Sequence, residues 1–278
     1  MKPAVFDYVR ADSAEAAIAF LAQYGDDARI LAGGQSLMAV LNMRLAQPAL
    51  LIDISQSPQM RESVISAGGL LIGASTTQAE IARRSNLMAE VPLLAQAFPH
   101  ISHVQIQNRG TVCGSVAHAD PSAELPLVLL ALRGEVLLQS NRASRTVSAQ
   151  DFITGMLTTT RRPDELVRSV RYPLAKAATG YAFGEFALRH GDYAACAVAA
   201  VVGRDGIRIA IGGVADCPTA RDWPLLKGSA LDDALNELAW DLEARDDPQV
   251  SAQARRHLVR RLGLRVIEAA RQAMENPS

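Results

Sequence analysis

The sequence predicts an α+β protein of two domains, residues 1–175 and 176–278. In the first part, short apolar runs alternate with amphipathic segments and are separated by glycine pairs, a pattern typical of a mixed fold. The second part has three apolar runs separated by turn residues and then two amphipathic runs, which predicts an antiparallel sheet followed by helices. Pro173 and the segment LAKAATG mark a change of composition, so we place the domain boundary near residue 175.

The N-terminal elements are marked by capping and turn residues. Ser13 is a good N-cap for a helix over residues 14–24, and Gly25 ends that helix. A short apolar strand over 29–32 then runs into Gly33 and Gly34. The next predicted elements are a short helix over 37–45, which Pro48 ends, and a buried strand over 50–54.

Two β-hairpins are expected in the middle of the chain, residues 64–66 with 70–73 and residues 135–139 with 145–147. Thr77 and Glu80 have the spacing of a capping box at the start of a helix. Two more helices are predicted, one over 92–103 and one that begins at Asp120 and Pro121 and is apolar over 125–132. Residues 166–172 are the last strand before the boundary.

The C-terminal part is predicted to contain strands over 181–188, 195–204 and 207–215, with Asp205 and Gly206 as a two-residue turn. Residues 194–202 are also compatible with a helix, because a short apolar run does not separate the two states. Helices are expected over 229–243 and 251–274. The second of these has an apolar side and an arginine-rich side, and a solvated face is the default interpretation of those arginines.

Composition excludes several classes of function. A formal net charge of -1 over 278 residues provides no basic field for nucleic acid. The longest apolar runs, 125–132 and 194–202, are too short to cross a bilayer, and the N-terminal residues do not resemble a signal peptide, so we expect a cytoplasmic protein. Cys113, Cys196 and Cys217 lie outside any CxxC pattern, so we expect no iron–sulfur cluster or other metal site in this chain.

Two glycine-containing segments are the candidate binding elements. Gly33 and Gly34 precede Gln35 and Ser36, and such a turn can present several backbone N–H groups to an anion. A second segment, NRGTVCGS, carries the hydroxyl groups of Thr111 and Ser115. Neither segment matches the GxxxxGK[ST] or GxGxxG patterns. A Gly-Gly pair alone more often only turns the chain, but two such segments suggest two walls around one anionic ligand, such as a pyrophosphate.

These two segments, AGGQS and NRGTVCGSVAHADPSAELP, resemble the flavin-binding loops of the FAD-binding medium subunits of molybdenum hydroxylases. That family includes the flavoprotein subunits of carbon monoxide dehydrogenase and the flavin domain of xanthine dehydrogenase. The resemblance extends over most of the chain, through PALLIDI, DELVRSVRYP, RHGDYA and the C-terminal ARRHLVRRLGLRVIEAA. It implies a two-subdomain FAD-binding domain of the PCMH or vanillyl-alcohol-oxidase type, followed by a small α+β domain.

The resemblance also implies a function. This chain would carry FAD in an electron relay, with a large molybdenum-cofactor subunit and a small iron–sulfur subunit as partners in a heterotrimer or its dimer. The partner would hydroxylate the substrate, and electrons would leave from FAD to an external acceptor. No catalytic acid or base is expected in this chain, because the flavin performs the redox chemistry itself.

The residues implied in cofactor binding fall into three groups. The backbone of the two loops would hold the pyrophosphate, Ile101 with Leu166 and Tyr193 would approach the ring system, and acidic side chains would accept hydrogen bonds from hydroxyl groups. The loop residues are Leu31, Ala32, Gly33, Gly34, Gln35, Ser36 and Leu37 in the first segment and Thr111, Val112, Cys113, Gly114 and Ser115 in the second, and the acidic residues are Asp120 and Glu124.

Three positions depart from the family pattern or invite another interpretation. Cys113 stands where a glycine is usual, so its backbone must adopt a conformation that a Cβ tolerates or accept strain. Gln107 stands where an arginine is common, which weakens the expectation of a cationic clamp there. His118 is not expected to link flavin covalently, because the family binds FAD without a covalent bond.

Two alternatives remain open. One is a self-sufficient flavin oxidase of the vanillyl-alcohol type, although the residues after 175 are few for enclosing a substrate. The other is a cofactor-free assembly subunit in which the glycine turns only fold the chain.

Overall fold

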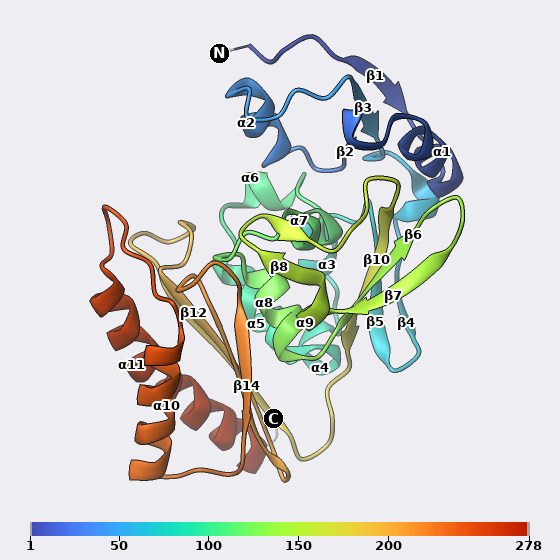
Figure 1. The fold of residues 1–278 in the computed structure, drawn as a ribbon. Coiled ribbons are helices and arrows are strands. Elements are labelled where there is room, and N and C mark those ends of the chain that lie inside the picture. The colour runs from blue at the N-terminus through green and yellow to red at the C-terminus, as the bar shows by residue number, and fades with distance from the viewer. Residues whose placement is uncertain (1, 277–278) are drawn as a thin grey trace.

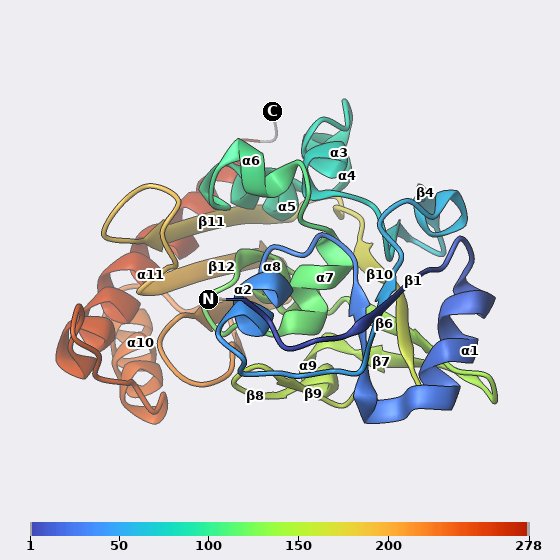
Figure 2. The same cartoon turned by 90° about the horizontal axis from the view of Figure 1, so that it is seen from above.

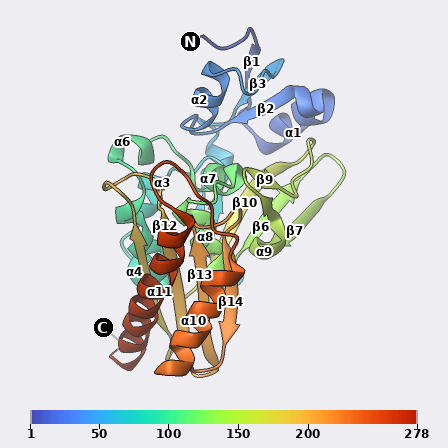
Figure 3. The same cartoon turned by 60° about the vertical axis from the view of Figure 1, so that its left-hand side comes forward.

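The computed structural model describes residues 2–276, and Figures 1 to 3 show their arrangement as mixed helices and sheets. An N-terminal three-stranded sheet lies at one end of the molecule, a five-stranded sheet with its helices lies in the middle, and a four-stranded sheet covered by two long helices lies at the other side (Figure 1). A small two-stranded ribbon, β8 (Ile153–Gly155) with β9 (Thr158–Thr159), completes the sheets.

The N-terminal sheet is parallel, with the order β1 (Asp7–Arg10), β3 (Leu50–Asp53), β2 (Ala28–Leu31). Helix α1 (Ala14–Tyr24) packs on it through buried residues that include Ile18 and Leu21. The predicted cap is confirmed, since the Oγ of Ser13 accepts a hydrogen bond from the N–H of Ala16 at 3.1 Å. A short 3-10 turn, η1 (Gly25–Asp27), connects α1 to β2.

Two details of this part were not predicted correctly. Helix α2 (Leu37–Asn42) ends earlier than residue 45, because Arg44 adopts a left-handed conformation with φ of 57°. The edge strand β1 was not expected, because DYVR has no apolar run. The buried strand β3 is where the sequence placed it, although it ends at Asp53 rather than residue 54.

The five-stranded sheet is antiparallel throughout. Its order is β4 (Ser63–Ser66), β5 (Gly69–Gly73), β10 (Leu166–Pro173), β6 (Glu135–Gln139), β7 (Ser144–Ser148). Both predicted hairpins are confirmed, and the strand predicted over 166–172 is the central strand β10. One face of this sheet packs against the helices of the middle layer, where the buried hydroxyl of Tyr172 donates to the carbonyl oxygen of Leu125 at 3.1 Å.

The middle layer consists of short helices. They are α3 (Gln78–Ala82), α4 (Leu87–Glu90), α5 (Pro92–Ala97), α6 (Val104–Gln107), α7 (Val112–His118), α8 (Glu124–Ala131) and α9 (Ala149–Phe152), with the 3-10 turns η2 (Pro58–Met60) and η3 (Phe98–His100). The capping box before α3 is confirmed, because Thr77 and Glu80 bond to each other's backbone N–H groups.

Two of the helix ranges predicted for this layer are wrong. The helix expected over 92–103 divides into α5 and η3, and the chain is extended at Ile101. Helix α8 begins at Glu124 rather than at Asp120, because Asp120 instead forms a side-chain turn in which its Oδ1 accepts from the N–H of Ser122 at 2.8 Å.

The C-terminal sheet is antiparallel in chain order, β11 (Gly180–Phe186), β12 (Cys196–Gly203), β13 (Gly206–Gly212), β14 (Thr219–Trp223). Residues 194–202 are therefore mainly strand rather than helix. The two-residue turn consists of Arg204 and Asp205, since Gly206 already pairs with Gly203. Strand β14 is polar and was not predicted.

Helices α10 (Ser229–Asp241) and α11 (Ala252–Glu275) cover the outer face of this sheet (Figure 3). The inner face carries Ala197, Ala199 and Ala210 into the same buried cluster as α5 and α8, so the hydrophobic core continues across residue 175. The arginines of α11 are not all solvated, because Arg255 is buried. The division into two domains at residue 175 stays a prediction.

Candidate functional site

A cleft of about 900 Å³ lies where the N-terminal sheet meets the middle layer and the loop between β11 and β12. This volume is within the range of about 300–1,000 Å³ that is usual for ligand sites. Most of the residues that the sequence assigned to cofactor binding line this cleft, namely Ala32, Gly33, Gly34, Gln35, Ser36, Leu37, Ile101, Thr111, Cys113, Gly114, Ser115, Asp120, Glu124, Leu166 and Tyr193. Leu31 and Val112 do not line it, and Val112 is fully buried beneath it.

The two predicted loops touch each other. A Cβ placed on Gly33 would lie 2.3 Å from the carbonyl oxygen of Arg109 and 2.6 Å from the Cα of Gly110, so only glycine fits at this crossing. Gly34 has φ of 72°, a left-handed conformation that glycine adopts without strain. Two segments that are far apart in the sequence therefore form one continuous wall.

The first loop presents free amide groups. It connects β2 to α2, and the carbonyl oxygens of Gly34 and Ser36 accept the first bonds of α2 from Met38 and Val40 at 3.0 and 3.1 Å. Within residues 2–276, the N–H groups of Gly34, Gln35 and Ser36 donate no hydrogen bond to the protein. Unpaired donors at the start of a helix are a suitable environment for a phosphate oxygen.

The second loop is the start of a helix, not the glycine turn that the sequence suggested. Thr111 is the N-cap of α7, and its Oγ1 accepts from the N–H of Gly114 at 3.0 Å. Cys113 has helical geometry, so the predicted backbone strain at this residue is absent, and its thiol donates to the carbonyl oxygen of Ile72 at 3.3 Å. Gly114 is needed because a Cβ there would lie 2.6 Å from the Oγ1 of Thr111.

The loop between β11 and β12 closes one end of the cleft and lies beside α6 in Figure 2. Gly191 in this loop packs against His103, and Tyr193 follows with 64% of its surface exposed at the mouth of the cleft. Gln107 has a structural task here, because its Nε2 donates to the carbonyl oxygen of Ile101 at 2.7 Å and so fixes the extended backbone at that residue.

Two buried carboxyl groups lie at this same end. Glu124 lines the cleft, and burial raises its pKa to about 7, with a further contribution from the charge of Asp120. Burial and the nearby Glu124 raise the pKa of Glu185 to about 8. The Oε1 of Glu185 lies 3.4 Å from the Nδ1 of His100, whose own pKa is lowered by burial and by the charge of His190.

Sequence reasoning missed two residues at the other end, Arg29 and Arg161. Arg29 belongs to β2, and Arg161 belongs to the segment between β9 and β10. No motif marks either residue, and their proximity depends on the fold, which brings β2 near the segment that precedes β10. No sequence pattern could have identified these two arginines as part of the cleft.

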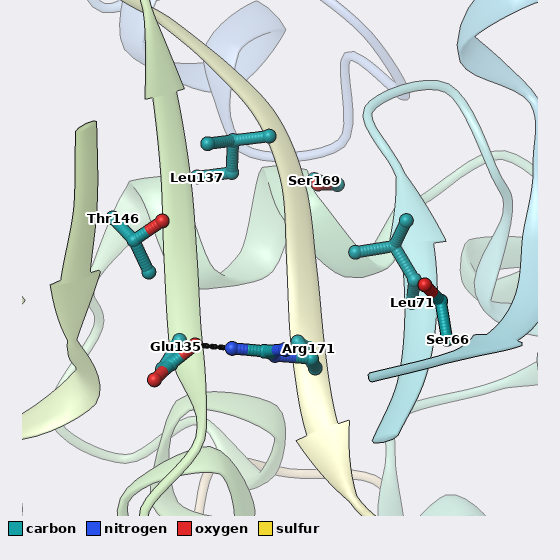
Figure 4. Close-up of a pocket in the computed structure, with 7 residues that line it drawn as sticks. All are labelled: Ser66, Leu71, Glu135, Leu137, Thr146, Ser169 and Arg171. Atoms are coloured by element: carbon teal, nitrogen blue, oxygen red, sulfur yellow. Dashed lines mark hydrogen bonds and ion pairs between the residues drawn. The ribbon is translucent and has the colours of Figure 1, made fainter. Parts of the chain in front are cut away.

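A second depression, of about 170 Å³, is not a candidate site. It lies on the outer face of the five-stranded sheet, where Figure 4 shows Arg171 of β10 pointing toward Glu135 of β6. These two charged side chains of the depression pair with each other, so neither is free to bind a ligand. In the part of the chain that the structure describes, no group of three or more His, Cys, Asp or Glu residues could hold a metal ion, and no helix is long and apolar enough to span a membrane.

Comparison with known proteins identifies the family. Residues 4–175 match the model for the FAD binding domain in molybdopterin dehydrogenase. The chain belongs to this family. The FAD assignment that the sequence suggested is therefore confirmed, and so is the assignment to the medium subunits of molybdenum hydroxylases.

One relative is the 6-hydroxypseudooxynicotine dehydrogenase complex subunit alpha of Paenarthrobacter nicotinovorans. It is 43% identical to this chain over 205 residues, which cover 74% of this chain and 69% of the relative. The nicotine 6-hydroxylase medium subunit of the same organism is 38% identical and aligns over 88% of this chain and 90% of its own.

Solved structures show the same fold over the whole length. Carbon monoxide dehydrogenase from Hydrogenophaga pseudoflava matches with a TM-score of 0.91 and 30% identity over 99% of both chains. Quinoline 2-oxidoreductase from Pseudomonas putida 86 matches with a TM-score of 0.91 and 33% identity over 99% of this chain and 100% of its own.

Proposed function

We propose that the cleft holds FAD and that this chain is the FAD-carrying electron-transfer subunit of a heteromeric molybdenum dehydrogenase. It takes electrons from the iron–sulfur clusters of a small partner subunit, which receive them from a large molybdenum-cofactor subunit, and it passes them to an external acceptor. The relatives support this proposal, because carbon monoxide dehydrogenase and nicotine 6-hydroxylase chains of the same family are named as medium chains or medium subunits. A cytoplasmic location stays a prediction of the sequence.

The observation that carries the proposal is the contact between the two loops. Gly33 and Gly110 meet at one point, and the unpaired amides of Gln35 and Ser36 adjoin it. A diphosphate supplies acceptors for such donors without requiring a lysine. The lining therefore fits the pyrophosphate of a dinucleotide.

The other residues of the cleft have roles in binding and orientation. FAD, when bound, supplies the redox chemistry itself. Glu124 provides a carboxyl group for a hydroxyl of the cofactor, and Ile101 and Leu166 provide apolar contacts. Tyr193 provides an aromatic face and a hydroxyl at the mouth, where it limits access of water.

The layout also supports a two-subdomain domain of the PCMH or vanillyl-alcohol-oxidase type. One subdomain is the three-stranded sheet with α1, and the other is the five-stranded sheet with its helices. Their buried residues form separate clusters, and the cleft lies between them.

The two alternatives are less well supported. For a self-sufficient flavin oxidase, the four-stranded sheet would need to enclose a substrate, but its two faces are packed against α5 and α8 and against α10 and α11. For a cofactor-free assembly subunit, the unpaired amides of the first loop would have no purpose.

The test is purification of the full chain together with its co-expressed partners. We expect the absorbance bands of oxidised flavin, release of the colour on acid precipitation, and co-purification with a large molybdenum-containing chain and an iron–sulfur chain. Colourless protein after reconstitution with FAD would rule out the proposal, and colour retained in the acid pellet would show a covalent link instead.

A further inference from the structure

The end of the cleft away from Tyr193 contains two guanidinium groups. Arg29 projects from β2, and Arg161 precedes β10. The apolar side chains of Leu21 and Ile30 line the same region. The charges of Asp120 and Glu124 act on Tyr193, whereas the charge of Arg29 acts on Arg161, so the cleft has an aromatic end and a cationic end, and the glycine loops line it as well.

Both guanidinium groups are held in place by backbone carbonyl groups. The Nη1 of Arg161 donates to the carbonyl oxygens of Arg162 and Glu165, each at 2.8 Å. The Nη1 of Arg29 donates to the carbonyl oxygens of Asp26 at 2.7 Å and Ala28 at 2.8 Å. Each planar group is therefore fixed through one nitrogen, and within residues 2–276 its other N–H groups donate to no protein atom.

The charges of Glu165, Asp26 and Asp164 act on Arg161, but none of these carboxylates forms an ion pair with either guanidinium. Glu165, which immediately precedes β10, is occupied by Arg145, whose Nε and Nη2 lie 2.7 and 2.8 Å from its two oxygens. Within residues 2–276, neither Arg29 nor Arg161 has an acidic oxygen within 4.0 Å. Burial and the positive charge of Arg29 lower the pKa of Arg161. The folded chain thus holds two guanidinium groups near each other without a direct ion pair to either.

FAD has no phosphate beyond the pyrophosphate assigned to the glycine loops, so the group that it can offer to these arginines is a ring. Arginine stacks on aromatic faces, and Leu21 and Ile30 add apolar lining to the same cleft. A dinucleotide whose pyrophosphate lies at the glycine loops must extend one nucleoside toward each end of the cleft.

The geometry points to Arg29 and Arg161 as an adenine-binding clamp that makes the chain select FAD over FMN. This inference rests on the proposed function, because it assumes that the pyrophosphate of FAD lies at the glycine loops. It assigns a ligand group, the purine ring, to residues that neither the sequence nor the family resemblance singled out.

The test measures affinities of the flavin-free full chain for FAD and FMN by quenching of flavin fluorescence. We expect Arg161→Leu to weaken FAD binding about thirtyfold, the equivalent of one desolvated cation–π contact. FMN binding should not change, because FMN lacks the adenosine half. The FAD affinity of Arg161→Lys should lie between those of Arg161→Leu and the unmodified chain, since an ammonium keeps the charge but not the planar face.

The matched control is Arg162→Leu, which makes the same substitution one residue further on, at an exposed position that does not line the cleft. It should bind both flavins like the unmodified chain. If Arg161→Leu does not fold, Arg29→Leu and Arg161→Lys carry the same comparison. In addition, ADP should displace FAD from the unmodified chain and lose affinity in parallel with FAD in the variants.

Three outcomes would overturn the clamp. FAD affinity of Arg161→Leu could equal that of Arg162→Leu, FMN affinity could fall as much as FAD affinity, or ADP could fail to compete. Each leaves the proposed function intact if FAD still binds the unmodified chain. Failure of the unmodified chain to bind either flavin would instead reject the proposed function and the clamp together.

Discussion

Gly33 and Arg109 approach each other so closely that a Cβ on Gly33 would lie 2.3 Å from the carbonyl oxygen of Arg109. This contact joins the first loop to the segment that begins the second. The two walls of the cleft can approach this closely only because Gly33 has no side chain. A backbone carbonyl cannot yield as a flexible side chain does. The crossing is therefore the most sensitive point of the phosphate-binding region.

Gly33→Ala is expected to separate the two loops and abolish or strongly weaken FAD binding. The measurement is the flavin content of purified protein and the affinity of the flavin-free chain for FAD. Gly203→Ala is the control, because a Cβ there would meet only the Oγ1 of Thr179 at 3.7 Å. Equal flavin content in the two variants would show that the crossing does not set the geometry of the site.

The sequence predicted local features better than distant ones. Hairpins and apolar strands follow from short patterns, and the cap at Ser13 is a local interaction, so these predictions were confirmed. Helix α7 was missed because VCGSVAH contains a glycine and β-branched residues of low helix propensity, and it is supported instead by a bond from the N–H of Val112 to the carbonyl oxygen of Thr76. The proximity of Arg161 to Arg29 of β2 is a long-range feature of the fold that no local pattern encodes.

Tyr193→Ala is expected to open the mouth of the cleft. Because 64% of the Tyr193 surface is exposed, its removal should cost little stability. Bound flavin should become more accessible to iodide, measured as stronger collisional quenching of its fluorescence. Leu188→Ala is the control, since Leu188 is an exposed residue of the same loop that does not line the cleft. Identical quenching in both variants would contradict a covering role for Tyr193.

Arg255→Met is expected to destabilise the chain by about 2–4 kcal/mol, because it leaves two buried backbone carbonyl groups without a donor. The Nη1 of Arg255 donates to the carbonyl oxygens of Ala195 at 2.6 Å and Gly213 at 2.5 Å, and its Nη2 pairs with Asp247. It thereby holds α11 against the ends of β12 and β13, next to the loop that carries Tyr193. Urea denaturation measures the free energy of unfolding.

Arg260→Met is the control for Arg255→Met. The Nη1 of Arg260 donates to the Oδ1 of Asn236 at 2.9 Å in an exposed contact on the same helix, and such contacts are worth about 1 kcal/mol or less. A loss of stability that is the same in both variants would mean that the buried guanidinium does not brace the sheet.

Glu124 and Glu185 predict how the stability of the flavin-free chain depends on pH. Both carboxyl groups have a reference pKa of 4.5, which burial raises to about 7 for Glu124 and about 8 for Glu185. Between these values the unfolded chain releases protons that the folded chain keeps. The free energy of unfolding contributed by these groups is therefore complete below pH 4.5 and declines as the pH rises through 7 and 8.

Glu185→Gln is expected to flatten this decline, because the amide has nearly the shape of the protonated acid and does not ionise. The measurement is the melting temperature of the flavin-free chain from about pH 5 to about pH 9, an interval that covers the raised pKa values of buried acids. His100, Glu124 and His190 are the titratable groups near Glu185, so the double variant with Glu124→Gln should be flatter still. Glu237→Gln, at an exposed position of α10, should follow the unmodified chain. If the melting temperature of Glu185→Gln declines with pH as that of Glu237→Gln does, Glu185 is already ionised in the folded chain. The carboxyl groups near the Tyr193 end would then not be protonated at neutral pH.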